Sequence, residues 1–175
     1  MSTGRTTTNA VRSTDADAPS AEARLRELGI RVPVLPPPVA VYVPAVRTGN
    51  LVFASGQTPT IDGVLQLQGR LGDAVSVEEA KGAARLAALN CLAEVRGLLG
   101  SLDRVARVVR LTGYVASAPG FGEQPAVMNG ASQLIEEVFG AAGQHARSAI
   151  GVAELPGGAP VEVELIVEVL HGASR

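Results

Sequence analysis

The stretch that decides the fold is HARSAIGVAELPGGAPVEVELIVEV, residues 145–169. Along its second half, apolar and acidic side chains alternate with the period of two that is typical of a half-buried strand. The apolar positions are Val161, Val163, Leu165, Val167 and Val169, and the acidic positions are Glu162, Glu164 and Glu168. The pattern predicts a strand that buries one face and lines the other with carboxylates.

The first half of this stretch carries one arginine, Arg147, and is joined to the second half by LPGGAP at 155–160. Such glycines and prolines suit a tight reversal, so the two segments are expected to lie side by side or to turn a corner together. Arg147 and Glu162 could then share a site. The other interpretation of Arg147 is a strand-edge charge that deters aggregation, or an ion pair with Glu162 or Glu164.

A hairpin is predicted earlier in the chain, with strands at about 39–47 and 51–55 around Thr48-Gly49-Asn50. Ser55-Gly56-Gln57 ends its second strand, where the glycine lets a ligand or another backbone approach closely. The phenylalanines are interpreted as core residues: Phe53, Phe121 and Phe139.

Two amphipathic helices are predicted after the hairpin, with one strand between them. Ser76 and Glu79 form a capping box that begins the first helix, over 77–99, whose alanine-rich face suits close packing on a sheet. The valine- and leucine-rich stretch 104–116 favours a strand. Apolar residues recur at helical spacing over 127–139, which predicts the second helix.

The predicted order is β-β-α-β-α-β-β, an α+β fold in which both helices cover one face of a single sheet. Apolar residues make up 46% of the chain and charged residues 18%, which is more apolar surface than a monomer of this size would hide. We therefore expect identical subunits to cover the other face of the sheet, with sites where subunits meet.

One domain accounts for the 175 residues. Residues 1–20 contain almost nothing to bury and are expected to form a disordered tail, whereas 21–38 form an N-terminal arm that begins with a short helix at 21–28. The chain shows no signal for secretion and no apolar run long enough to span a membrane, so a cytoplasmic location is expected.

Composition argues against several classes of function. The net charge is −2 and the basic residues are scattered, so no basic stripe exists to bind nucleic acid. Cys91 is the single cysteine and is interpreted as a small buried hydrophobe. Two histidines far apart in the sequence give no metal-ligand spacing.

Two blocks of sequence resemble the RidA (YjgF) imine deaminases, a family also called L-PSP endoribonucleases. One is Ala146-Arg147-Ser148…Ala153-Glu154-Leu155-Pro156, followed by Val161-Glu162-Val163-Glu164. The other is Tyr42-Val43…Gly49-Asn50-Leu51…Ser55-Gly56-Gln57-Thr58-Pro59. Asn129, at the start of the second helix, also matches. The resemblance spans about 39–170, looks closest to a longer subgroup with an N-terminal arm, and implies a chorismate-mutase-like mixed sheet and a homotrimer.

By this resemblance, Arg147 would hold the carboxylate of a 2-imino acid in bidentate fashion. Glu162, 15 residues later as in the family, would position a water against the C=N carbon. Ammonia would leave and a 2-oxo acid would remain, with no metal or organic cofactor. Ala149 stands where the family often has cysteine, but the group used there is held to be the backbone carbonyl that orients water, so Ala149 could still serve.

The remaining site residues are also carried over from the resemblance. Tyr42 would close the pocket, Ser55 and Gly56 would supply a wall and a backbone N–H, and Asn129 would either bind substrate or cap its helix. His145 replaces the family's typical proline and is interpreted as a surface histidine, with an extra polar contact as the alternative.

Two functions other than imine hydrolysis remain open, namely a non-enzymatic trimer that binds small carboxylates and a specialised biosynthetic member of the same family. A ribonuclease is disfavoured by the pI of about 5.7 and by the lack of a catalytic histidine pair.

Overall fold

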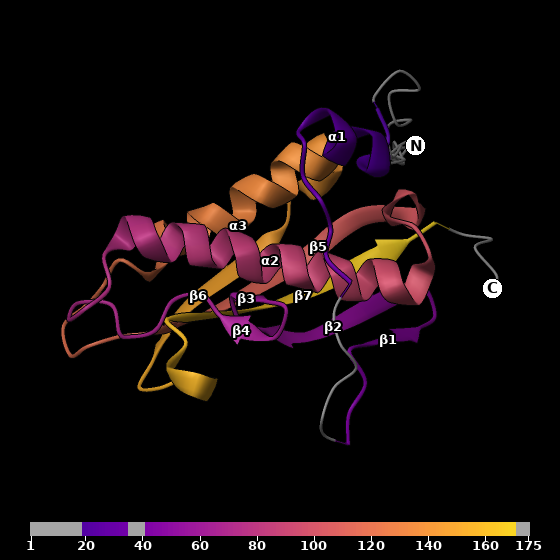
Figure 1. The fold of residues 1–175 in the computed structure, drawn as a ribbon. Coiled ribbons are helices and arrows are strands. Elements are labelled where there is room, and N and C mark those ends of the chain that lie inside the picture. Colours follow the sequence, from indigo (N-terminus) through magenta and orange to yellow (C-terminus); the bar gives the residue numbers. More distant parts are fainter. Residues whose placement is uncertain (1–18, 35–40, 171–175) are drawn as a thin grey trace, which may run out of the picture.

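The computed structural model describes residues 19–34 and 41–170. The fold is α+β, with one five-stranded sheet and two long helices on one of its faces (Figure 1). The predicted order of elements is confirmed. The predicted short helix, α1 (Ala21–Glu27), lies before the first strand. A two-stranded hairpin that was not predicted, formed by β3 (Thr60–Ile61) and β4 (Val64–Leu65), is inserted after the second strand. Of the predicted tail over 1–20, residues 1–18 lie outside the described residues, as does the end of the arm, and Ser20 is the N-cap of α1.

The main sheet is mixed, as expected. Its strands are β1 (Ala45–Thr48), β2 (Leu51–Gln57), β5 (Val105–Ala116), β6 (Ala146–Val152) and β7 (Val161–Val169). They are arranged in the order β1-β2-β7-β5-β6, and only the β5–β6 pair is parallel. Strand β5 therefore separates β6 from β7, and the prediction that these two segments could lie side by side is wrong.

The connection from β6 to β7 explains this separation. It contains a turn, η3 (Pro156–Gly158), and crosses the end of β5 instead of closing a hairpin. Ala116 N donates to Pro160 O at 2.9 Å, and Ser117 N donates to Val152 O at 2.9 Å. These hydrogen bonds attach both ends of the connection to β5, so β7 adds to the sheet on the side of β5 away from β6.

The first strand is shorter than predicted. Residues 41–44 are not in a strand, and β1 begins at Ala45. Pro44 has no N–H to donate to a strand partner, although its carbonyl still accepts from Ser55 N at 2.8 Å. Strand β2 continues two residues beyond the predicted end, to Gln57.

Both long helices form as predicted. Helix α2 (Val77–Leu99) begins with the capping box, in which Ser76 Oγ accepts from Glu79 N at 3.3 Å and Ser76 N donates to Glu79 Oε2 at 2.9 Å. Helix α3 (Gln124–Phe139) lies beside α2 over the sheet (Figure 1). The two backbones approach so closely at Gly130 that a Cβ there would overlap the backbone carbonyl of Lys81.

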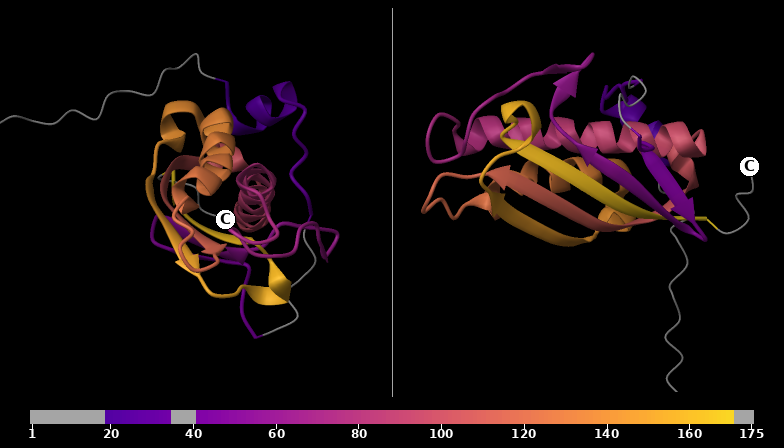
Figure 2. Two further views of the ribbon diagram at one scale, coloured as in Figure 1. Left: turned by 90° about the vertical axis from the view of Figure 1, so that its left-hand side faces the viewer. Right: turned by 90° about the horizontal axis from the view of Figure 1, so that it is seen from below.

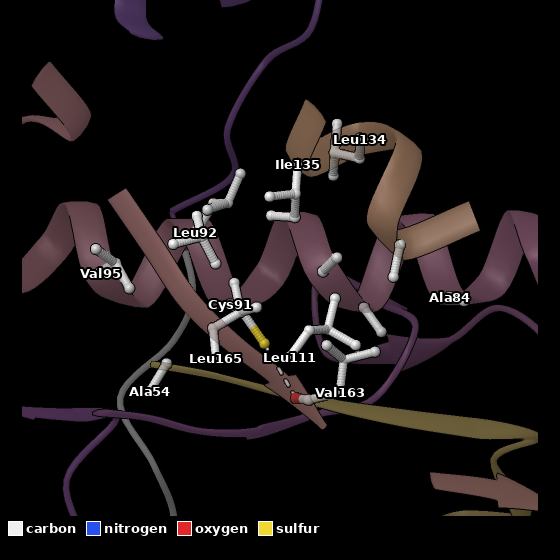
Figure 3. Packing of buried hydrophobic residues seen from close by; sticks show 14 of the residues in the cluster. Ala54, Ala84, Cys91, Leu92, Val95, Leu111, Leu134, Ile135, Val163 and Leu165 are labelled. Atoms are coloured by element: carbon white, nitrogen blue, oxygen red, sulfur yellow. Dashed lines mark hydrogen bonds between the residues drawn. The ribbon is translucent and has the colours of Figure 1, made fainter. Parts of the chain in front are cut away.

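The core lies between the helices and the sheet (Figure 3). Cys91 is fully buried and donates its S–H to Val163 O at 3.0 Å, which confirms its interpretation as a buried residue. Burial raises the pKa of the Cys91 thiol well above its ordinary value, so the thiol remains a donor. Phe121 and Phe139 pack against the core, but Phe53 is 37% exposed and its assignment to the core is wrong.

The face of the sheet opposite the helices is not covered by any part of the chain that the structure describes (Figure 2). Val46, Phe53 and Ile150 are exposed there, beside the three glutamates of β7. We call this surface the open face. That identical subunits cover it stays a prediction. Within residues 19–34 and 41–170, no helix has the length and apolar character needed to cross a membrane.

Candidate functional site

The predicted site residues fall into two groups, one on each face of the sheet. Strand β5 shows this directly, because residues paired across strands point to the same face. Its buried Leu111 is paired with Arg147 of β6, whereas its Tyr114 is paired with Glu162 of β7. Arg147 therefore points toward the helices and Glu162 toward the open face. The two residues therefore do not meet within one chain, and a site that they share stays a prediction.

Arg147 lies on the edge strand β6 and is held by α3. Its Nη1 donates to Asn129 Oδ1 and to Ser132 Oγ, both at 3.0 Å, and its Nη2 donates to Pro125 O at 3.3 Å. Three of the five guanidinium N–H groups thus have partners. The Nε–H and one Nη2–H have none among the described residues, and these neighbouring donors suit a carboxylate bound in bidentate fashion.

A cavity of about 300 Å³ lies beside this guanidinium. Its wall is formed by residues of α3, of β6 and of the segment between them: Ser132, Glu136, Gly143, Gln144, His145 and Arg147. We call it the Arg147 cavity. A small carboxylate in it would lie next to a fixed cation, which is the arrangement that anion binding requires.

Of the two roles expected for Asn129, the structure excludes helix capping, and substrate binding stays a prediction. Helix α3 begins at Gln124 with Glu123 as its N-cap, so Asn129 lies inside the helix and does not cap it. Its side-chain oxygen instead accepts from Arg147. Ser132 performs the same task and was not among the predicted site residues. Its spacing is the signal that could have found it, because residues three apart share one face of a helix.

Ala149 follows Arg147 by two residues on the same strand, is partly buried and packs against the core. Within the described chain, β6 pairs with β5 on one side only. The backbone along the other edge of β6 therefore has no strand partner there, and a ligand beside Arg147 can reach it.

On the open face, Glu162 lies directly over Gly56. A Cβ at position 56 would overlap Glu162 Oε1, so only glycine leaves room for the carboxylate. Burial raises the pKa of Glu162 above its ordinary value of 4.5, and the neighbouring Glu164 carboxylate raises it further. The Tyr114 hydroxyl donates to Glu164 Oε2 at 3.2 Å, whereas Glu162 has no hydrogen-bond partner among the described residues.

Ser55 and Tyr42 belong to the same group as Glu162. Ser55 Oγ donates to Val43 O at 2.7 Å, which ties β2 to the segment that leads into β1. Tyr42 lies in this segment and is 54% exposed. A side chain exposed to this extent can face a ligand or a second chain.

The structure thus contains two half-sites. The first, with Arg147, Asn129 and Ala149, offers donors to an anion. The second, with Glu162, Gly56, Ser55 and Tyr42, offers a partly buried carboxylate whose pKa is raised above its ordinary value. In the part of the chain that the structure describes, no three His, Cys, Asp or Glu residues gather into a group that could hold a metal ion.

Comparisons with known proteins agree with this fold. A family model described as "YjgF/chorismate mutase-like, putative endoribonuclease" matches residues 22–169. Protein TCP17 of Trypanosoma cruzi is 47% identical over 148 residues, which cover 84% of this chain and 92% of TCP17. The crystal structure of Atu1372 from Agrobacterium tumefaciens, a protein of unknown function, has 47% identity and a TM-score of 0.79 and covers 86% of this chain and 92% of Atu1372.

A more distant relative has a defined activity. The 2-iminobutanoate/2-iminopropanoate deaminase of Dermatophagoides farinae is 30% identical over 141 residues, which cover 80% of this chain and 94% of the deaminase.

Proposed function

The chain belongs to the YjgF/chorismate mutase-like family, and from this membership we propose that it hydrolyses reactive 2-imino acids to 2-oxo acids and ammonia. The observation that carries the proposal is the Arg147 guanidinium, which α3 holds with two donors left for a carboxylate. The relative named as a 2-iminobutanoate/2-iminopropanoate deaminase supports this class of substrate.

We propose further that the active site forms between chains of a homotrimer. A small imino acid cannot span a sheet, yet Arg147 and Glu162 lie on opposite faces of one. A site with both residues therefore needs the Arg147 half-site of one copy and the Glu162 half-site of the next. Val46, Phe53 and Ile150, exposed on the open face, supply the apolar surface for such contacts.

The chemistry needs only groups of this chain and a water. With the substrate carboxylate on Arg147, Glu162 takes a proton from water as the oxygen attacks the C=N carbon. Proton transfer to the nitrogen of the carbinolamine then lets the C–N bond break, so that ammonia leaves and a C=O bond forms. The Ala149 carbonyl orients the water, Gly56 N–H and Ser55 border the carboxylate, and Tyr42 closes the pocket.

Replacing Glu162 with glutamine tests this proposal. An amino-acid oxidase or a threonine dehydratase generates the imine, and its disappearance is followed with and without the protein. We expect the wild type to accelerate imine loss, and Glu162→Gln to reduce that acceleration by roughly 10²- to 10⁴-fold, the usual contribution of a general base. Glu168→Gln, on the same strand and face, is the matched control and should react at nearly the wild-type rate. No acceleration by the wild type would refute the proposal.

The pH profile offers a second test. Only the deprotonated carboxylate of Glu162 can accept a proton, and burial, followed by the Glu164 charge, raises its pKa above 4.5. We therefore expect kcat/KM to fall as the pH falls through this raised pKa, with the midpoint of the acid limb above pH 4.5. Glu164→Gln should move the midpoint to lower pH without abolishing the shift, because burial is the larger cause. A midpoint at or below 4.5 would contradict this role for Glu162.

A second candidate function is a non-enzymatic trimer that binds small carboxylates, and a separate alternative is a specialised step in a biosynthetic pathway that uses the same pocket. The binder is favoured by the separation of the half-sites, because Arg147 can hold an anion without Glu162. Calorimetric titration with 2-oxobutyrate, run beside the imine assay, tests for a binder. If the protein is only a binder, Glu162→Gln keeps its affinity for 2-oxobutyrate, and the wild-type protein does not accelerate imine loss.

A further inference from the structure

A series of hydrogen bonds leads from the backbone of Gly143 to the guanidinium of Arg147. His145 Nδ1 lies 2.6 Å from Gly143 O, and His145 Nε2 lies 3.1 Å from Ser132 Oγ. Ser132 Oγ in turn accepts from Arg147 Nη1 at 3.0 Å. All four residues border the Arg147 cavity. His145 is partly buried with both ring nitrogens engaged, so its interpretation as a surface histidine is wrong.

The donors and acceptors determine the direction of these bonds. A carbonyl oxygen only accepts, so Nδ1 of His145 carries a hydrogen and donates it to Gly143 O. In the neutral ring Nε2 is then an acceptor, and the Ser132 hydroxyl donates to it. With its hydrogen committed to His145, Ser132 Oγ presents a lone pair to the Nη1–H of Arg147.

We propose that His145 is a positioning residue that acts through Ser132 to orient Arg147 for its ligand. The inference rests on the proposed function, in which Arg147 holds the substrate carboxylate. A long arginine side chain loses much rotamer entropy when it is fixed, so affinity improves when the protein fixes it in advance. Asn129 and Ser132 occupy both Nη1 hydrogens, but a serine hydroxyl rotates freely unless a partner holds it. His145 is that partner, and Gly143 O holds the ring.

Substitutions in this series should affect binding more than the chemical step. The loss of one neutral hydrogen bond costs about 0.5–1.5 kcal/mol, so we expect Ser132→Ala and His145→Phe each to raise KM, and the Kd for 2-oxobutyrate, roughly 2- to 13-fold. The value of kcat should change little, because neither residue touches the reacting atoms. His145→Gln should restore most of the affinity, because its amide oxygen can accept from Ser132. Gln133→Ala, exposed on α3 beside Ser132, is the control.

The double variant Ser132→Ala/His145→Phe distinguishes action through Ser132 from a separate effect. If His145 acts through Ser132, the double variant should bind no more weakly than Ser132→Ala alone. Effects that add in full, or a His145→Phe variant with wild-type KM and Kd, would overturn the proposal.

Nitrogen NMR of the histidine side chains gives a readout that needs no substrate. The His145 signals are identified because they are missing from the spectrum of His145→Gln. We expect the neutral ring of His145 to carry its hydrogen on Nδ1, and Ser132→Ala to shift the Nε2 resonance. A neutral ring protonated at Nε2 would overturn the proposal. If the wild type neither binds 2-oxobutyrate nor hydrolyses imines, the proposed function fails, and the nitrogen shifts still decide whether the hydrogen-bond series exists.

Discussion

Arg147→Ala should lower kcat/KM for imine hydrolysis on the order of 10²- to 10⁴-fold. Hydrogen bonds to a charged group contribute about 1.5–3 kcal/mol each, and the two donors left on the guanidinium would supply two of them. Arg147→Lys should recover little of the loss, because an ammonium group keeps the charge but cannot bind a carboxylate through a planar pair of donors. Rates and 2-oxobutyrate affinity measured on the same preparations test both variants.

Arg26→Ala provides the control, because Arg26 is exposed on α1, away from the Arg147 cavity. It should match the wild type in rate and affinity. A folded Arg147→Ala protein that hydrolyses imines as fast as the wild type would show that this cation does not hold the substrate.

Gly130→Ala adds one methyl group where α2 and α3 meet, and it should destabilise the fold strongly. The new Cβ would overlap the backbone carbonyl of Lys81, and a backbone atom cannot move aside as the end of a side chain can. Overpacking of this kind costs about 1–3 kcal/mol or more, which corresponds to a fall in Tm of roughly 2–12 °C for a chain of this length. Thermal unfolding at matched protein concentration measures it.

Gly82→Ala is the matched control for this prediction. Gly82 is also a helical glycine, but it is exposed on α2, and a Cβ there would meet nothing within 4 Å. Alanine should therefore stabilise the protein by up to about 1 kcal/mol through its better helix propensity. Equal melting temperatures for Gly130→Ala and the wild type would mean that the two helices are farther apart than described.

Gly130 also links stability to the site, because its neighbour Asn129 holds Arg147. A shift of α3 away from α2 would move Asn129 and Ser132 together. We expect Gly130→Ala to weaken carboxylate binding below its unfolding temperature, whereas Gly82→Ala should leave binding unchanged.

Several elements were predictable because their signals lie in neighbouring residues. The bounds of α2 follow from the capping box at Ser76 and the glycine at 100, and both were visible in the sequence. The alternation over 161–169 predicted which side chains of β7 are buried, and the structure confirms each of them. Cys91 was recognised as a core residue from its apolar surroundings.

Other features depended on contacts between distant parts of the chain. The sequence shows that Arg147 and Glu162 lie on strands, but the position of β5 between those strands decides that they face opposite sides of the sheet. Likewise, nothing local pairs Ser132 with His145, because the two meet only where the middle of α3 packs over the start of β6.

By itself, the sequence determined the type and order of the long helices and of the main strands, which strand faces are apolar, and which residue types are available for binding an anion and moving a proton. These properties depend on backbone propensity and on the period of side chains along one element. Only the tertiary structure decided the order of strands and the partners of each polar side chain, because both are set by long-range packing that no local pattern encodes. For this reason the sequence could supply candidate residues for a site, but not their division into two half-sites or the contacts of Ser132 and His145.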